Sequence, residues 1–219
     1  MSRTSRATER ALSSSHADAW AWQVLRPLLD GRPYLPWTEG ALRPAALVAV
    51  LNEIAFAERQ TVVELGSGVS SIVIGRLLDQ RGGKLTAVEH DPAWAALVRS
   101  QVEREELGDV VEVIVSPLEP HEPSWSGAPW YSPESVARLP GDIGLLLIDG
   151  PPGYGEGMSH SRYPAMAALA DRVGAWGLVI LDDADRKPER EIIARWTTEH
   201  PDWTFGIDAE IGLALGSRP

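Results

Sequence analysis

Short apolar runs alternate with longer segments of helical spacing from about residue 60 to the end of the chain. This alternation is typical of βαβ units, which build a parallel sheet covered by helices. The apolar runs predict strands at residues 61–65, 84–89, 110–115, 143–149, 177–182, 202–207 and 211–216. The segments between them predict helices at residues 69–79, 92–104, 162–173 and 188–198. The last two strands are too close together for a crossover helix, so we expect them to pair as an antiparallel hairpin at one edge of the sheet.

The first sixty residues do not follow this alternation. Two segments, 17–29 and 44–59, have helical spacing, and a loop with turn residues and aromatics separates them. Residues 1–15 are rich in Arg and Ser, with a single acid, which is typical of a disordered tail. The sequence therefore predicts three parts: a tail over residues 1–15, a helical cap over residues 16–59 and a doubly wound α/β domain over residues 60–219.

A glycine-rich turn follows the first predicted strand. The strand ends at Glu64-Leu65, and Gly66-Ser67-Gly68 leads into a helix that begins near Ser70. Glycines let the backbone pass close beneath a ligand, and the start of the helix offers amide N–H groups. Glu89 ends the second strand, where a carboxylate accepts hydrogen bonds from ribose hydroxyls. The layout predicts a Rossmann-like fold that binds a nucleoside.

Glu64 distinguishes between the possible nucleosides. Its carboxylate would repel a pyrophosphate, but it tolerates the ammonium and sulfonium groups of S-adenosylmethionine. The third glycine of the dinucleotide pattern is also missing, because Ser71 stands in its place. S-adenosylmethionine is therefore the preferred ligand. A nicotinamide-dependent oxidoreductase and a non-catalytic nucleoside-binding module are the alternatives from other classes.

These segments resemble the class I S-adenosylmethionine-dependent methyltransferases over roughly residues 60–217, with a core like that of catechol O-methyltransferase. Glu64-Leu65-Gly66-Ser67-Gly68 is similar to their first motif, and Val88-Glu89-His90-Asp91 to the segment that holds the ribose. Ile148-Asp149-Gly150-Pro151-Pro152-Gly153 is similar to the fourth motif of small members with DGPPG at this strand end. The resemblance implies a seven-stranded, mostly parallel sheet whose last strand is reversed. It also implies cofactor contacts from Glu64, Gly66, Ser67, Gly68, Ser70, Glu89, His90 and Asp149. For His90 the alternative, which we prefer, is that it caps the helix that begins near Asp91-Pro92.

Ser116 and Leu118 are candidates for the adenine contact because they leave the third strand on the adenine side. They open a proline-rich segment, residues 116–141, that also contains three aromatic residues. Long irregular loops in compact domains are usually functional or disordered, and the aromatics argue against disorder. We predict that Trp130 or Tyr131 forms part of a pocket wall.

Charge and composition limit the partner. A formal charge of −11 over 219 residues argues against a nucleic-acid acceptor, because phosphate binding depends on clustered Lys and Arg. No segment reaches the ~20 apolar residues of a membrane span. The absence of Cys excludes disulfides and zinc–thiolate sites, and it fits a reducing compartment. We expect a cytoplasmic protein that acts on a small molecule, with a homodimer as one option for its assembly.

Three acids at the carboxyl ends of the central strands, Asp149, Asp182 and Asp183, are candidates for the chemistry. In a first interpretation they hold a divalent cation such as Mg²⁺, because an all-oxygen set suits that class of metal. The metal would lower the pKa of an acceptor hydroxyl. Metal-dependent catechol-type O-methyltransferases have Asp, Asp and Asn at equivalent strand ends, so Asp183 departs from their pattern.

A second interpretation needs no metal: Asp149 acts as a base or orients the acceptor. His160 is a nearby group that titrates close to neutrality, and Arg162 is placed to clamp an acceptor carboxylate or hydroxyl. In a third interpretation, Asp149 only holds the cofactor. We predict an S-adenosylmethionine-dependent methyltransferase with Asp149, His160 and Arg162 as catalytic candidates. Its cap would cover the acceptor, preferably a hydroxyl on a small molecule, with a small amine as the alternative.

Overall fold

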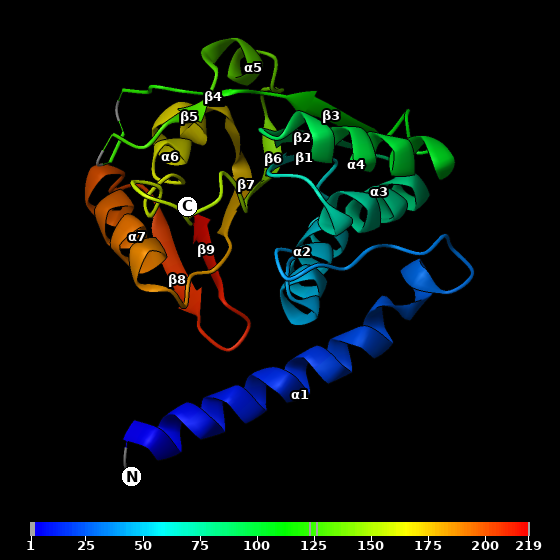
Figure 1. Ribbon diagram of the computed structural model, residues 1–219, viewed down its shortest axis with the longest axis horizontal. Coiled ribbons are helices and arrows are strands. Elements are labelled where there is room, and N and C mark those ends of the chain that lie inside the picture. The colour runs from blue at the N-terminus through cyan, green and yellow to red at the C-terminus, as the bar shows by residue number, and fades with distance from the viewer. Residues whose placement is uncertain (1–2, 123, 126, 219) are drawn as a thin grey trace.

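The computed structural model describes residues 3–122, 124–125 and 127–218, and only the backbone of residues 3–11 (Figure 1). Its main feature is a seven-stranded sheet in the order β3-β2-β1-β6-β7-β9-β8. Five neighbouring strands are parallel: β1 (Thr61–Leu65), β2 (Lys84–Glu89), β3 (Val111–Val115), β6 (Ile143–Ile148) and β7 (Val173–Leu181). Strand β9 (Leu213–Ser217) lies antiparallel between β7 and β8 (Thr204–Asp208). This order confirms the predicted α/β class and the antiparallel pair at the edge.

The central strands β1 and β6 are buried on both faces of the sheet. Alternate residues of each strand point to opposite sides and so contribute to two different cores. Val62 and Leu145 belong to one apolar core, and Val63 and Leu146 belong to the other. The first core is covered by α1 (Arg3–Leu29), α2 (Pro44–Phe56), α3 (Val69–Arg81) and α4 (Pro92–Arg104). The second core is covered by α5 (Pro133–Ala137), α6 (Pro164–Leu169), the 3-10 turn η1 (Ala170–Arg172) and α7 (Lys187–Glu199). Within the described residues, no helix is long and apolar enough to cross a membrane.

Two glycine turns touch where β1 and β6 end. Gly66 has a φ of +100°, a backbone conformation that L side chains rarely adopt. A Cβ on Gly150 would lie 3.0 Å from the Gly66 nitrogen and would also collide with the Tyr131 hydroxyl. Glycine at these two positions therefore lets the two strand ends approach one another.

The N-terminal part differs from the predicted tail. Helix α1 already begins at Arg3, whereas residues 1–2 lie outside the described residues. Ser13 Oγ donates to Glu210 Oε1 (2.6 Å), and Ser14 Oγ donates to the Glu210 carbonyl (2.8 Å). These contacts join α1 to the turn between β8 and β9. Local composition cannot predict them, because the two segments are far apart in sequence. Figure 1 shows α1 running beneath α2, on the side of the molecule away from α5.

A buried ion pair ties the start of the chain to the domain. Arg76 of α3 donates to both oxygens of Glu105 (2.6 and 2.7 Å), and each of the two side chains is 1% exposed. Arg76 also donates to the carbonyls of Leu28 and Pro33. The loop between α1 and α2 is thereby held against α3, and its residues 38–41 reach the main cavity.

Two other segments depart from prediction. The helix expected over residues 162–173 is shorter and runs from Pro164 to Leu169. Proline suits the first turn of a helix. The next strand begins earlier than predicted, at Val173. Residues 116–141 are only partly irregular. They contain a short antiparallel pair, β4 (Leu118–Glu119) with β5 (Trp130–Tyr131), and helix α5.

Candidate active site

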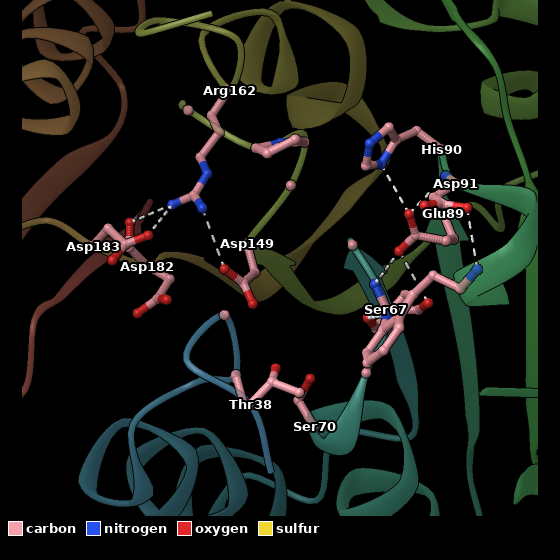
Figure 2. A pocket seen from close by; sticks show the side chains of 18 of the residues that line it. Thr38, Ser67, Ser70, Glu89, His90, Asp91, Asp149, Arg162, Asp182 and Asp183 are labelled. Atoms are coloured by element: carbon pink, nitrogen blue, oxygen red, sulfur yellow. Dashed lines mark hydrogen bonds and ion pairs between the residues drawn. The ribbon is translucent and has the colours of Figure 1, made fainter. Parts of the chain in front are cut away.

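A cavity of about 620 Å³ lies beyond the carboxyl ends of the central strands, where a doubly wound sheet binds ligands. Its wall combines the glycine turn after β1, the end of β2, the end of β6, the loop after β7 and residues 38–41 of the cap. The cavity has two chemically different ends. One is formed around Glu89 and the glycine turn, and the other around Asp149 and Arg162 (Figure 2).

Glu89 is held rigidly at the first end. Its Oε2 accepts from the backbone N and the Oγ of Ser67 (3.1 Å each), and its Oε1 accepts from the Asp91 nitrogen (2.9 Å) and pairs with His90 Nδ1 (2.8 Å). Burial opposes ionisation of Glu89, but the bonds from His90, Asp91 and Ser67 lower its pKa overall. Since a carboxylate accepts about four hydrogen bonds, these partners occupy Glu89, and a ligand hydroxyl could bond to it only by displacing a side-chain donor such as Ser67 Oγ or His90.

His90 has two roles open to it at this position. Its hydrogen bond to Glu89 raises its pKa against the effect of burial. The helix that follows is capped by Asp91, whose Oδ1 accepts from the nitrogens of Ala93 (2.8 Å) and Trp94 (3.2 Å). His90 therefore does not cap this helix, and it lies beside Glu89 on the cavity wall.

Glu64 is fully buried behind the glycine turn. Its Oε2 accepts from Ser71 Oγ, which in turn accepts from the Gly68 nitrogen. Burial raises the pKa of Glu64 to about 7, although hydrogen bonds from Ser70 and Ser71 oppose the shift. Its Oε1 has no hydrogen-bond partner among the described residues. Glu64 was predicted to contact the cofactor, but it is not part of the cavity wall. Its predicted preference for a cationic ligand would therefore act through the electric field of its carboxylate and not through contact.

The three acids of the metal hypothesis do come together. One carboxylate oxygen from each of Asp149, Asp182 and Asp183 lies within 4.8 Å of the others. Burial, opposed by Arg162, raises the pKa of Asp149 to about 6, and Glu64 and Asp183 add to the shift. Burial and the neighbouring Asp149 and Asp183 raise the pKa of Asp182 well above its usual range. Repulsion within the cluster is therefore relieved either by protonation of a carboxylate or by a nearby positive charge.

Arg162 provides a positive charge within the cluster. Figure 2 shows its side chain reaching from the loop after β6 toward Asp149 and Asp183. Its Nη2 donates to Asp149 Oδ1 (3.3 Å), and its Nη1 donates to Asp183 Oδ2 (3.0 Å) and to the Asp182 carbonyl (3.0 Å). The guanidinium thus bonds two of the three candidate metal ligands. A divalent cation among these oxygens would lie beside a fixed positive charge, so the residues present fit the guanidinium better than a metal.

Several predicted residues lie on the cavity wall and others do not. Gly66, Ser67, Gly68, Ser70, Glu89, His90, Asp149, Arg162, Asp182 and Asp183 form part of it. His160 lies outside it: its Nε2 pairs with Glu191 Oε2 of α7 (2.9 Å), and its ring stacks on Trp125 at 4.0 Å between centroids. The loop turns Arg162 inward and His160 outward, so the predicted catalytic role of His160 gains no support from its position.

The predicted adenine contacts also lie elsewhere. Ser116 is fully buried, and its Oγ accepts from the Ser132 nitrogen (3.0 Å). Leu118 pairs with Tyr131 in the short sheet and packs on the second core. Neither residue is part of the cavity wall. The wall beside Glu89 is formed instead by residues that include Trp94, whose Nε1 donates to the Ser67 carbonyl (2.7 Å).

Tyr131 is the aromatic residue of the proline-rich segment that reaches the cavity, as predicted for Trp130 or Tyr131. Its hydroxyl is buried without a hydrogen-bond partner among the described residues. Burial raises the Tyr131 pKa well above its usual range, with Glu89 adding to the shift, so the hydroxyl stays a donor. The sequence reasoning missed Trp94, Arg186 and residues 38–41 because their approach depends on the packing of distant elements.

Comparison with known proteins places this geometry in a family. Residues 63–184 match the profile of the family described as "Methyltransferase domain". None of the curated proteins compared with the chain matches it.

Solved structures share the fold over almost the whole chain. The SAH-bound Podospora anserina methyltransferase PaMTH1 has 13% identity, with 100% of this chain and 97% of that chain covered and a TM-score of 0.67. Cofactor-bound Rv0187 from MTB has 17% identity, 92% and 89% coverage and a TM-score of 0.61. The SAH complex of the O-methyltransferase from Bacillus cereus has 16% identity, 93% and 91% coverage and a TM-score of 0.58. The chain therefore belongs to the methyltransferase domain family, and its sheet has the Rossmann-like arrangement of the class I S-adenosylmethionine-dependent enzymes.

Proposed function

We propose that this methyltransferase takes the methyl group of S-adenosylmethionine and transfers it to a hydroxyl group of a small molecule. The observation that carries the proposal is the pairing of Asp149 with Arg162 in the same cavity as Glu89 and the glycine turn. The two ends of the cavity would hold the acceptor and the cofactor, respectively.

Support for the cofactor comes from the charges around the turn. Glu89 is preorganised to accept from ribose, and the buried Glu64 favours an ammonium group nearby. The SAH-bound relatives named above share the fold that forms this end of the cavity. A pyrophosphate at the glycine turn would be repelled by the ionised form of the buried Glu64 behind it, which argues against the nicotinamide alternative.

In the proposed reaction, the bond between the sulfonium sulfur and the methyl carbon breaks, and its electron pair remains on sulfur to give SAH. The acceptor oxygen forms the new bond to carbon in line with the leaving sulfur, so proximity and orientation supply most of the catalysis. The hydroxyl proton passes to Asp149. With a pKa of about 6, Asp149 is a better base than an exposed aspartate and is still mostly ionised at neutral pH.

Arg162 favours an oxygen acceptor over a nitrogen acceptor. A guanidinium stabilises the negative charge that develops on a hydroxyl oxygen as its proton leaves. An amine attacks without developing negative charge, so Arg162 contributes nothing to that transition state. A divalent metal is not part of this proposal, because Arg162 already bonds two of its three candidate ligands. The net charge of −11 supports a small acceptor rather than a nucleic acid.

The experiment is a transfer assay with S-adenosylmethionine labelled on its methyl group. Phenols, catechols, sugar alcohols and primary amines are offered separately, and labelled products are separated by chromatography. We expect an O-methylated product with the wild type and a rate lower by about 10²–10⁴ with Asp149→Asn. Asp202→Asn, on the exposed turn before β8, is the matched control and keeps the wild-type rate. Transfer to amines alone, or an unchanged rate in Asp149→Asn, would contradict the proposal.

A further inference from the structure

We propose that Arg162 takes the place of a divalent metal in this site: it neutralises the acids and binds the acceptor oxygen, so that methyl transfer proceeds without a metal. The role of Arg162 in methyl transfer rests on the proposed function. The occupation of the acidic cluster by Arg162 does not rest on it, and it can be measured in the ligand-free protein.

The fixed position of the guanidinium is the first support. The Arg162 side chain is 5% exposed, and backbone carbonyls hold it on two sides. Its Nε donates to the Pro151 carbonyl (3.4 Å), and its Nη1 donates to the Asp182 carbonyl (3.0 Å). A planar group held by this many bonds loses little entropy when it binds a further oxygen.

The occupation of the acids is the second support. Asp183 Oδ2 lies 3.0 Å from Arg162 Nη1 and 2.7 Å from Arg186 Nη2, so one oxygen serves two arginines. Arg186 is held in turn by the buried Glu189 (2.6 Å). A metal ion on Asp149 and Asp183 would either compete with three ion pairs or bind the second oxygen of each carboxylate, and in both cases it would lie next to two positive charges.

The remaining donor of Arg162 supplies the chemistry. A guanidinium has five N–H groups. Four of them are used toward Pro151, Asp182, Asp183 and Asp149, which leaves one N–H on Nη2 among the described contacts. This nitrogen adjoins Asp149 Oδ1 at the cavity wall. An acceptor hydroxyl there would give its proton to Asp149 and receive the hydrogen bond of Arg162 as its negative charge develops.

Binding of Mn²⁺ to the free protein, followed by electron paramagnetic resonance, tests the inference. We expect the wild type to bind Mn²⁺ at this site with a Kd above about 1 mM, which is typical of nonspecific binding to surface carboxylates. Arg162→Met removes the ion pair of Asp149 and one of the two ion pairs of Asp183, and should bind Mn²⁺ at least about tenfold more tightly. Adding Asp183→Asn to that variant should abolish the gain. Arg138→Met, which breaks an exposed ion pair with Glu112 outside the cavity wall, is the matched control and gains nothing.

Two results would overturn the inference: submillimolar Mn²⁺ binding by the wild type that Asp182→Asn abolishes, or no gain of binding in folded Arg162→Met. If circular dichroism shows that Arg162→Met does not fold, the wild-type titration and Arg162→Lys decide. Arg162→Lys keeps the charge and should stay without Mn²⁺. If Arg162→Met gains Mn²⁺ binding but the wild type methylates no acceptor, Arg162 does occupy the acidic cluster, and only the proposed function is rejected.

Discussion

The charge of Glu64 should control how cofactor affinity varies with pH. Glu64 is fully buried, and burial raises its pKa to about 7 in spite of hydrogen bonds from Ser70 and Ser71. An ammonium group at the glycine turn stabilises the ionised form of Glu64, so binding lowers this pKa. Below pH 7, ligand binding must therefore release a proton, and affinity must rise as the pH rises.

The size of the effect follows from the pKa. With a pKa of about 7 in the free protein, roughly nine-tenths of Glu64 is ionised at pH 8 and roughly one-tenth at pH 6. If the ionised form alone binds well, the apparent Kd for SAH rises about tenfold from pH 8 to pH 6. This change corresponds to about 1.4 kcal/mol.

Calorimetric titration with SAH at pH 6, 7 and 8 measures the change directly. The control ligand is 5′-methylthioadenosine, which has the same nucleoside but lacks the amino acid end, and its Kd should change little. The control variant is Glu64→Gln, which should bind SAH more weakly at pH 8 and lose the pH dependence. Equal Kd values for SAH at pH 6 and pH 8, or the same dependence in Glu64→Gln, would refute the reasoning.

Three further predictions concern other residues. Arg76→Met should lower the free energy of unfolding, measured in urea, by about 3–5 kcal/mol, because it leaves Glu105 buried without its ion-pair partner. The double variant with Glu105→Leu should recover most of this lost stability. Tyr131→Phe should stabilise the free protein by about 1–3 kcal/mol, since it removes a buried hydroxyl that has no partner among the described residues. The same variant should bind SAH more weakly if that hydroxyl contacts the ligand. An unchanged unfolding midpoint would contradict the stability prediction. Because Asp149 must be ionised to accept a proton, kcat/KM for the acceptor should rise about tenfold per pH unit up to about pH 6 and then level off. A pH–rate profile without this rise would show that Asp149 is not the base.

The fold and one end of the site could be predicted from local sequence patterns. Strand and helix periods identify the βαβ units, and the carboxyl ends of parallel strands meet at one edge of a sheet. This rule is sufficient to bring Asp149, Asp182 and Asp183 together. It also places Glu89 next to the glycine turn, since β1 and β2 are hydrogen-bonded neighbours.

The direction of individual loop side chains could not be predicted. His160 and Arg162 are two residues apart on one loop, yet one pairs with α7 and the other enters the cavity. Their directions depend on the path of the chain after Gly150, which no period in the sequence encodes. The helical start of the chain was missed for a related reason, since Ser13 and Ser14 bind Glu210, nearly two hundred residues away.

The most direct measurement of the central claim is the binding of SAH to the wild-type protein at pH 8. Glu89→Gln is the test variant, and Glu112→Gln, on the exposed part of β3, is the control. The account predicts a micromolar Kd for the wild type and for Glu112→Gln, and a Kd weaker by at least about tenfold for Glu89→Gln. No binding of SAH by the folded wild type, or equal binding by Glu89→Gln, would contradict the assignment of this cavity to the cofactor.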